Sequence, residues 1–186
     1  MPKLCLSLLS FTLLLVAQGP KYGTGRPPAP EEVKALDISV PPSGDRLPEG
    51  SGTAGEGKEV YARRCQRCHG AEGKGGDEAA LIGGAGTLAT PKPLKTVGSY
   101  WPYATTLYDY IHRAMPFKDP GSLTPNQVYA VTAYILQLNG IIPATEKMTA
   151  ETLPKVKMPN RDGFIPDPRP DTGKPGTGKV RAGAKL

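Results

Sequence analysis

The first strong helical pattern of the chain begins after Thr53. Small, aromatic or thiol side chains recur at spacings of four, four and three residues, at Gly57, Tyr61, Cys65 and Cys68. This spacing places them on one face of a helix. Thr53 followed by Glu56 forms a capping box, which satisfies the first free amides of a helix. The pattern therefore predicts a helix that starts at Thr53, and Gly57 would allow another backbone to approach it closely.

Two later segments also have helical periodicity. The first carries apolar residues at Leu107, Tyr108, Ile111 and Met115, and Pro116 ends it. The second starts at a Thr124–Gln127 capping box with Pro125 in its first turn, where a missing amide costs little. Its buried stripe consists of Val128, Val131, Ile135 and Leu138, flanked by Ala130 and Tyr134. Gly140 then stops the helix.

Around these helices the sequence has no sustained periodicity. Pro and Gly are frequent before Thr53, where Glu31–Leu36 is one short helical candidate. Residues 70–94 contain many glycines, and a loop of this length in a compact domain needs a function. The predicted divisions are an N-terminal extension (20–52), a helical domain (53–142), a C-terminal extension (143–170) and a disordered basic tail (171–186).

The first 19 residues have the pattern of an export signal. Lys3 gives a positive start, and Leu4–Val16 is an apolar run too short to span a bilayer comfortably. Pro20 makes cleavage after Gly19 unfavourable, so an uncleaved membrane anchor is the alternative. The segment predicts a periplasmic or exported protein, with membrane contact only if the segment is retained.

Composition and charge narrow the interpretation further. The chain has 186 residues, of which 23 are Gly and 21 are Pro, so its own core would be thin. A covalently held apolar group would supply the missing volume. The formal net charge is +6, but without Lys3 and the tail from Asp171 onward the body holds 18 basic and 16 acidic residues. This near balance gives no indication of a nucleic-acid partner.

The candidate chemistry lies at Cys65-Gln66-Arg67-Cys68-His69. Two thiols three positions apart can each form a thioether with one vinyl group of a porphyrin, and the following imidazole can bind its iron. The motif therefore predicts one covalently bound haem c. A redox dithiol is an alternative, although such a motif is expected within a βαβ unit. A zinc site is another, but outside the signal-like start, which contains Cys5, only His112 is a further ligand.

The second axial ligand of the iron has four candidates: Met115, His112, Met148 and Met158. Met115 is favoured because Pro116 stops the helix and frees the sulfur to point out of a loop. Met158 also precedes a proline, but it follows the last helix. A lone histidine such as His112 is more commonly a packed side chain, and an iron without a second protein ligand is the remaining alternative. A thioether ligand raises the reduction potential and suits an electron carrier.

Three large rings stand within Tyr100-Trp101-Pro102-Tyr103. Trp101 is the only tryptophan, and it is either a hydrophobic plug or a donor whose indole N–H points at a haem propionate. We therefore include Trp101 among the candidate cofactor-binding residues. The glycine-rich residues 70–94 are expected to cover the ring edge and the proximal side of the haem.

Residues from about Thr53 to Asn139 resemble a class I c-type cytochrome. The shared order is a helix, Cys65-x-x-Cys68-His69, a loop, Met115-Pro116 and a helix. The resemblance implies an all-α fold of three to five short helices around one haem, with long Pro/Gly-rich extensions in this chain. It also implies that the first and last helices cross where Gly57 and Tyr61 meet Tyr134. The haem-binding residues that it implies are Cys65, Cys68, His69 and Met115.

The flanks resemble a narrower family, the cytochrome subunit of Sox-type sulfite or sulfane dehydrogenases. The segments that carry this resemblance are Tyr22-Gly-Thr-Gly-Arg26, Pro30-Glu-Glu32, Asp37-Ile38, Leu47-Pro48, Gly50-Ser-Gly-Thr53, Thr96-Val-Gly-Ser-Tyr-Trp-Pro-Tyr-Ala104, Arg113-Ala-Met-Pro-Phe117 and Met158-Pro-Asn-Arg-Asp-Gly-Phe164. In that family the cytochrome accepts electrons from a molybdenum-cofactor subunit that oxidises a sulfur substrate. Some members carry a second haem domain, whereas this chain has one attachment motif.

Together these interpretations predict an exported monohaem cytochrome that is not itself an enzyme. Its expected donor is a molybdoenzyme catalytic subunit, and its expected acceptor is another cytochrome or a terminal oxidase. A free periplasmic shuttle serving other respiratory partners is the alternative. A haem enzyme such as a peroxidase is less favoured, because the sequence offers neither a further thiolate for the iron nor a catalytic constellation of carboxylates or Ser and His.

Overall fold

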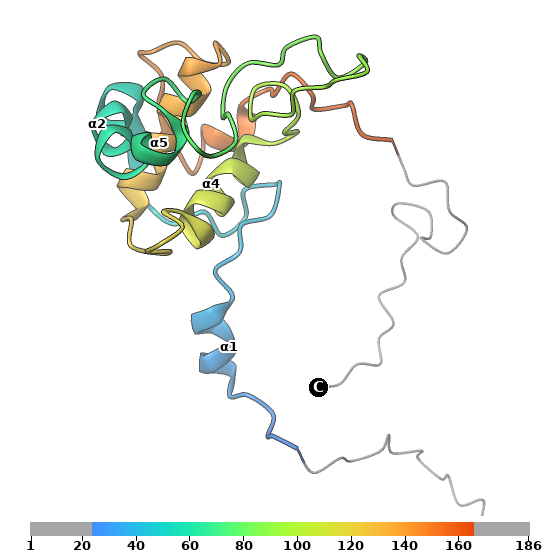
Figure 1. Cartoon of the computed structure of the whole chain (residues 1–186). Coiled ribbons are helices and arrows are strands. Elements are labelled where there is room, and N and C mark those ends of the chain that lie inside the picture. The colour runs from blue at the N-terminus through green and yellow to red at the C-terminus, as the bar shows by residue number, and fades with distance from the viewer. Residues whose placement is uncertain (1–23, 166–186) are drawn as a thin grey trace, which may run out of the picture.

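A computed structural model describes residues 24–165 of the chain (Figure 1). Its α-helices are α1 (Pro30–Leu36), α2 (Ala54–Arg64), α3 (Gln66–His69), α4 (Ala104–Ala114) and α5 (Pro125–Leu138). The strands β1 (Ser51–Thr53) and β2 (Lys147–Thr149) and a 3-10 turn η1 (Leu153–Lys155) complete the elements of this part. The predicted helical fold is confirmed, with a small β-ribbon added. The predicted signal segment, residues 1–19, and the basic tail, residues 171–186, lie outside the described residues.

Capping boxes define the starts of α2 and α5. Thr53 Oγ1 accepts the N–H of Glu56 at 3.4 Å, and the Glu56 carboxylate accepts the N–H of Thr53 at 2.8 Å. Thr124 and Gln127 make the same reciprocal pair at the start of α5, at 3.3 and 2.9 Å. Each box satisfies amides that have no partner inside the helix. Both helix starts lie where the sequence predicts them.

The helices α2 and α5 cross at Gly57. A Cβ atom at this position would lie 1.9 Å from the carbonyl oxygen of Ala130, so the two backbones can approach this closely only at a glycine. One turn further along α2, the ring of Tyr61 packs on Tyr134 with 5.3 Å between ring centroids. The expected crossing of the first and last core helices is therefore present.

The helix α4 packs against α5 and ends just before a proline. Tyr108 and Tyr129 are both fully buried, and their ring centroids lie 4.6 Å apart. The last residue of α4 is Ala114, and Met115 has an extended backbone with φ −123° and ψ 146°. Crowding by the ring of Pro116 disfavours helical geometry at the preceding residue. Met115 thus lies one position outside the helix whose hydrophobic pattern it continues.

A short ribbon joins the two flanks of the helical core. The strand β1 pairs antiparallel with β2, with Gly52 opposite Met148. Met148 and Leu153 are fully buried, and only 3% of Met158 is exposed. Residues after α5 therefore complete the hydrophobic core on which α2 and α5 also pack.

The N-terminal extension is fixed to the body from Val40 onward. The N–H of Val40 donates to the Asp109 carboxylate at 2.7 Å, and Arg113 donates to the same carboxylate at 2.9 Å. Burial of Asp109 opposes its ionisation, but the hydrogen bonds from Arg113 and Val40 outweigh burial and hold the pKa of this carboxyl below its usual range. Further along, the Tyr129 hydroxyl donates to the carbonyl oxygen of Pro48 at 2.9 Å. The segment before β1 is thus tied to both α4 and α5.

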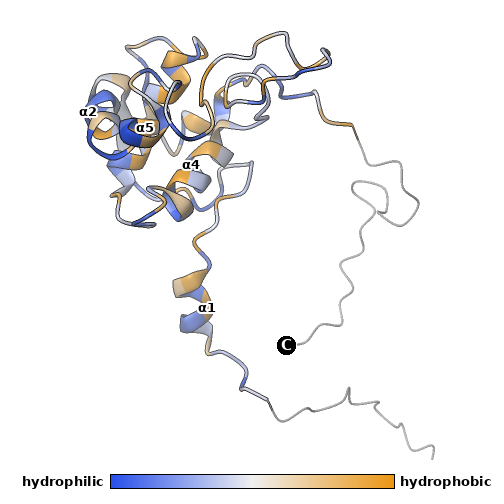
Figure 2. Ribbon diagram, viewed as in Figure 1, coloured by the Kyte–Doolittle hydropathy of each residue, from blue (hydrophilic) through white to orange (hydrophobic). Residues whose placement is uncertain are grey.

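The helix α1 differs from the rest of the extension. It buries none of its residues, and it lies apart from the body in Figure 1. Two of its apolar side chains are exposed, Val33 at 49% and Leu36 at 83%. Figure 2 shows hydrophobic and hydrophilic residues together on this short helix. Within residues 24–165, α1 included, no helix is long and apolar enough to cross a membrane.

The helix crossing generates a stability prediction. Gly57→Ala places a methyl group against the backbone of Ala130, and we expect it to lower the free energy of unfolding by about 1–3 kcal/mol. Gly55→Ala is the matched control in the same helix, because a Cβ there meets nothing within 4 Å. It should raise stability by about 0.5–1 kcal/mol through helix propensity. Urea unfolding followed by far-UV circular dichroism measures the free energy of unfolding of both variants. Equal changes in the two variants would contradict the close crossing at Gly57.

Candidate haem-binding site

The two thiols of the motif lie at the junction of α2 and α3. Cys65 ends α2 with φ −123° and ψ −38°, and its N–H still donates to the Tyr61 carbonyl oxygen at 2.9 Å. The N–H groups of Cys68 and His69 both donate to the Cys65 carbonyl oxygen at 3.1 Å. This single turn holds both side chains in one short segment. Cys65 is half-buried, Cys68 is exposed, and neither forms a disulfide.

The glycine-rich loop after His69 folds tightly back on α3. The N–H of Glu78 donates to the Cys68 carbonyl oxygen at 3.0 Å. A Cβ atom at Gly76 would lie 2.0 Å from that same oxygen, so the loop passes there only because the residue is glycine. On the other side, the Tyr61 hydroxyl donates to the carbonyl oxygen of Gly70 at 2.9 Å. The first part of the loop is therefore a fixed support for the motif.

This support determines how the imidazole of His69 is oriented. Its Nδ1 lies 3.1 Å from the carbonyl oxygen of Ala79, which can only accept a hydrogen bond. The proton of the neutral ring is therefore on Nδ1, and the lone pair of Nε2 is free for a metal. A histidine ligand usually makes such a hydrogen bond with its other nitrogen. Ala79 could not be predicted from the sequence, because the group that acts is a backbone carbonyl.

The dithiol and zinc alternatives find little support in this geometry. Burial raises the pKa of the Cys65 thiol to about 11, whereas a redox dithiol needs a lowered pKa. Among residues 24–165, no three His, Cys, Asp or Glu side chains come together as a metal site would require.

The four candidates for the second axial ligand occupy different environments. Met148 and Met158 are buried in the hydrophobic core, where they pack against other apolar side chains. Met115 is only partly buried at the edge of that core, in the extended residue that follows α4. His112 lies one turn before it, with a buried Nδ1 that has no hydrogen-bond partner in the described structure. The environments favour Met115 over the other two methionines, and His112 stays the alternative ligand.

Trp101 is half-buried and packs beside the same core. Its ring meets Tyr110 edge to face, with centroids 5.7 Å apart and an interplanar angle of 88°. This contact is consistent with Trp101 as a hydrophobic plug. A hydrogen bond from its indole N–H to a haem propionate stays a prediction.

The residues present fit a covalently attached haem. The donor set comprises two free thiols on one turn, an imidazole with Nε2 free and a partly buried thioether. Such a set suits iron in a porphyrin. Several apolar side chains at the edge of the core are also only partly buried, as expected of surfaces that a porphyrin would cover: Leu81, Trp101, Leu138 and Ile141.

Comparison with known proteins agrees with this chemistry. A family model described as cytochrome c matches residues 54–139, and this family implies covalently bound haem c. A chain in the crystal structure of the sulfane dehydrogenase SoxCD from Paracoccus pantotrophus is 39% identical, with a TM-score of 0.73. The alignment covers 89% of this chain and 85% of that one. No curated protein matches the sequence.

The attachment motif predicts the behaviour of a double variant. Cys65→Ala with Cys68→Ala removes both thioether bonds, so haem should be lost when the protein is denatured. A denaturing gel stained for haem should show the parent band stained and the double variant blank. Each single variant should keep haem through its remaining bond. A stained band for the double variant would contradict covalent attachment at these residues.

The axial assignment predicts a spectral change. Met115→Ala removes a thioether that stabilises Fe(II), so we expect loss of the sulfur-to-iron charge-transfer band in the ferric spectrum and a lower reduction potential. Met158→Leu is the control, because it keeps the volume of a buried core side chain. Spectroelectrochemistry measures the band and the potential together. If Met115→Ala resembles the parent and His112→Ala loses low-spin ligation, His112 is the ligand instead.

Proposed function

The chain belongs to the class I c-type cytochromes, and we propose that it accepts single electrons from the molybdenum-dependent subunit of a sulfite or sulfane dehydrogenase. One observation carries the choice of donor. The similarity to the SoxCD chain covers 89% of this chain, so it reaches well beyond the 54–139 cytochrome match and includes flanking segments. A free electron carrier does not need these flanking segments. Their similarity is explained if they contact another subunit in the same kind of complex.

In this proposal, the chain's residues hold the cofactor in defined roles. Cys65 and Cys68 would form the thioether bonds, and His69 through Nε2 and Met115 through its sulfur would bind the iron. Trp101 would donate its indole N–H to a haem propionate. When bound, haem c supplies a one-electron Fe(III)/Fe(II) couple, which suits electron acceptance in single steps. The acceptor that follows would be another cytochrome or a terminal oxidase.

The exposed helix α1 is the proposed contact with the molybdenum subunit. Its side chains Val33 and Leu36, together with Ile38 just beyond it, are between 44% and 83% exposed. A group of exposed apolar side chains on one segment is typical of an interaction site. The bond from Val40 to Asp109 fixes the base of this segment to α4, so a partner bound to α1 would be held close to the haem domain.

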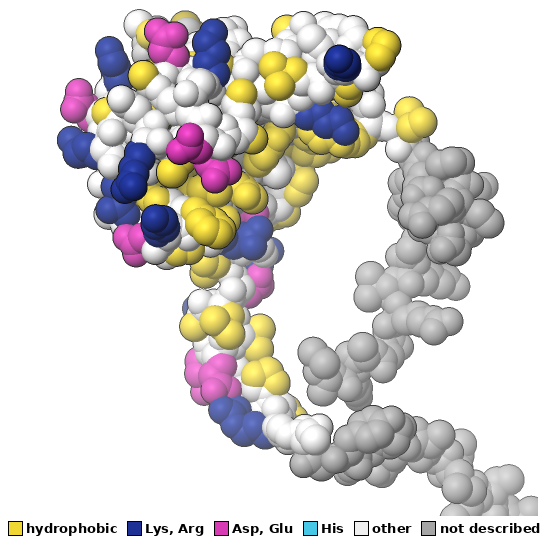
Figure 3. Space-filling view, in the orientation of Figure 1, with side chains coloured by type: hydrophobic (Ala, Val, Ile, Leu, Met, Phe, Trp, Pro, Cys, Tyr) yellow, Lys and Arg dark blue, Asp and Glu magenta, His cyan; other side chains and the backbone are white. Residues whose placement is uncertain are grey.

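Long-range charge steering has a minor part in this proposal. Figure 3 shows Lys and Arg side chains interspersed with Asp and Glu over the visible face of the body. Interspersed charges of both signs create only a weak directional field. Specific apolar contact is therefore the better explanation of partner choice than net charge.

Export is also part of the proposal. The signal-like residues 1–19 would direct the chain to the periplasm, where haem is attached to Cys-x-x-Cys-His motifs in bacteria. An uncleaved segment would anchor the chain to the membrane, and a cleaved one would release it.

The docking proposal is tested with a variant that leaves the body intact. Val33→Ser, Leu36→Ser and Ile38→Ser together remove apolar surface from α1 but keep the anchors at Val40 and beyond. We expect the partner concentration for half-maximal reduction to rise about tenfold or more, with an unchanged haem spectrum. Stopped-flow absorbance with the purified molybdenum subunit and its sulfur substrate measures this.

Deletion of residues 171–186 is the control, and it should alter the reduction rate only slightly. If the control abolishes reduction while the triple variant behaves as the parent, the interface assignment is wrong. If neither change matters and unrelated molybdoenzymes reduce the cytochrome equally well, the chain is a free periplasmic shuttle.

A further inference from the structure

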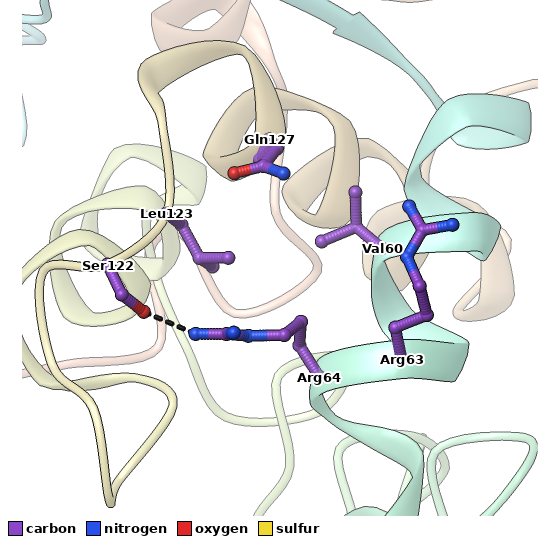
Figure 4. Close-up of a pocket in the computed structure, with 6 residues that line it drawn as sticks. All are labelled: Val60, Arg63, Arg64, Ser122, Leu123 and Gln127. Atoms are coloured by element: carbon purple, nitrogen blue, oxygen red, sulfur yellow. Dashed lines mark hydrogen bonds between the residues drawn. The ribbon is translucent and has the colours of Figure 1, made fainter.

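A hydrogen-bonded link joins the residue before the first thiol to the loop that follows Met115. Arg64 is the last residue of α2, and its Nη2 donates to the Asp119 carboxylate at 2.9 Å and to the Ser122 hydroxyl. Figure 4 shows the Arg64 side chain reaching across a hollow between α2 and the loop before α5 to meet Ser122. The hollow is lined by Val60, Arg63, Arg64, Ser122, Leu123 and Gln127.

Inside the loop, further hydrogen bonds carry this link towards the candidate ligand. The Ser122 hydroxyl donates to the Asp119 carbonyl oxygen at 2.7 Å. The N–H of Asp119 donates to the carbonyl oxygen of Pro116 at 2.8 Å, which closes a tight turn directly after Met115. Between Met115 and Thr124 the chain forms neither helix nor strand. Arg64 is therefore the side chain that ties this turn to the end of α2.

The two joined segments would hold opposite faces of the haem. The segment from Cys65 would be covalently attached and would provide His69, whereas Met115 would be bound only by its thioether. A ligand on a loop stays bound when the loop is held close, because closure keeps its effective concentration high. An exposed ion pair contributes little to global stability, but the same pair can decide whether a short loop opens locally.

We propose that Arg64 is a positioning residue that holds the 115–122 loop closed and so keeps Met115 on the iron. This inference rests on the proposed role of Met115. Arg64, together with Asp119 and Ser122, thereby sets how easily an external ligand replaces the methionine, a property that the cofactor-binding residues alone do not determine.

Imidazole competes with a methionine for ferric haem and serves as the probe. We expect Arg64→Gln and Asp119→Asn each to increase imidazole affinity about three- to tenfold, because the loop opens more readily. The double variant should show nearly the same increase as Arg64→Gln alone, since the Arg64 change already removes the contact with Asp119. Arg64→Lys keeps the positive charge, so it should hold the loop partly closed and increase imidazole affinity less than Arg64→Gln does.

Arg63→Gln is the matched control. Arg63 is adjacent to Arg64 and lines the same hollow, but it pairs at 3.7 Å with Glu59 inside α2 and not with the loop. It should leave imidazole affinity unchanged. Urea unfolding by far-UV circular dichroism should give the same midpoint for the Arg64 and Arg63 variants, which separates local loop opening from a general loss of stability.

Three outcomes would overturn the proposal. Arg64→Gln could match Arg63→Gln in imidazole affinity, the double variant could show the product of the two single effects, or the increased affinity could follow the unfolding midpoint. Met115→Ala identifies a failure of the axial assignment itself. If this variant keeps the parent's charge-transfer band and imidazole affinity, Met115 is not the ligand, and both assignments fall together.

Discussion

The close contact between α2 and α5 at Gly57 is the constraint on which the rest of the structure depends. Because no Cβ separates α2 from Ala130, the next turn brings Tyr61 against Tyr134. The hydroxyl of Tyr61 then reaches the Gly70 carbonyl, directly after the haem attachment motif. One packing contact thus positions the end of α2, the attachment segment and the beginning of the loop that supports it.

The candidate site is completed by two loops, one after His69 and one after Met115. On the proximal side, residues 70–79 bring a carbonyl oxygen to His69 Nδ1 and leave Nε2 free. The turn after Met115 is held to α2 by Arg64. The loop after His69 orients its imidazole, and in our proposal the turn after Met115 retains the thioether.

The sequence predicts those features that depend on neighbouring residues. The starts of α2 and α5 follow from Thr53 and Thr124, because a capping box is complete within four residues. The β1–β2 ribbon could not be predicted in this way, since its strands are three residues long and far apart in sequence. A methionine precedes a proline at both Met115 and Met158. Only the folded structure shows that Met158 lies in the core and Met115 at its edge.

One haem should give this protein a single-electron couple. A potentiometric titration of the purified protein, followed by its visible absorbance, measures this couple directly. We expect one reversible transition in which the ratio of oxidised to reduced protein changes tenfold for every ~59 mV, as for a one-electron couple. A slope near ~30 mV per tenfold change, as a two-electron dithiol couple gives, would contradict it, as would the absence of a reversible haem transition.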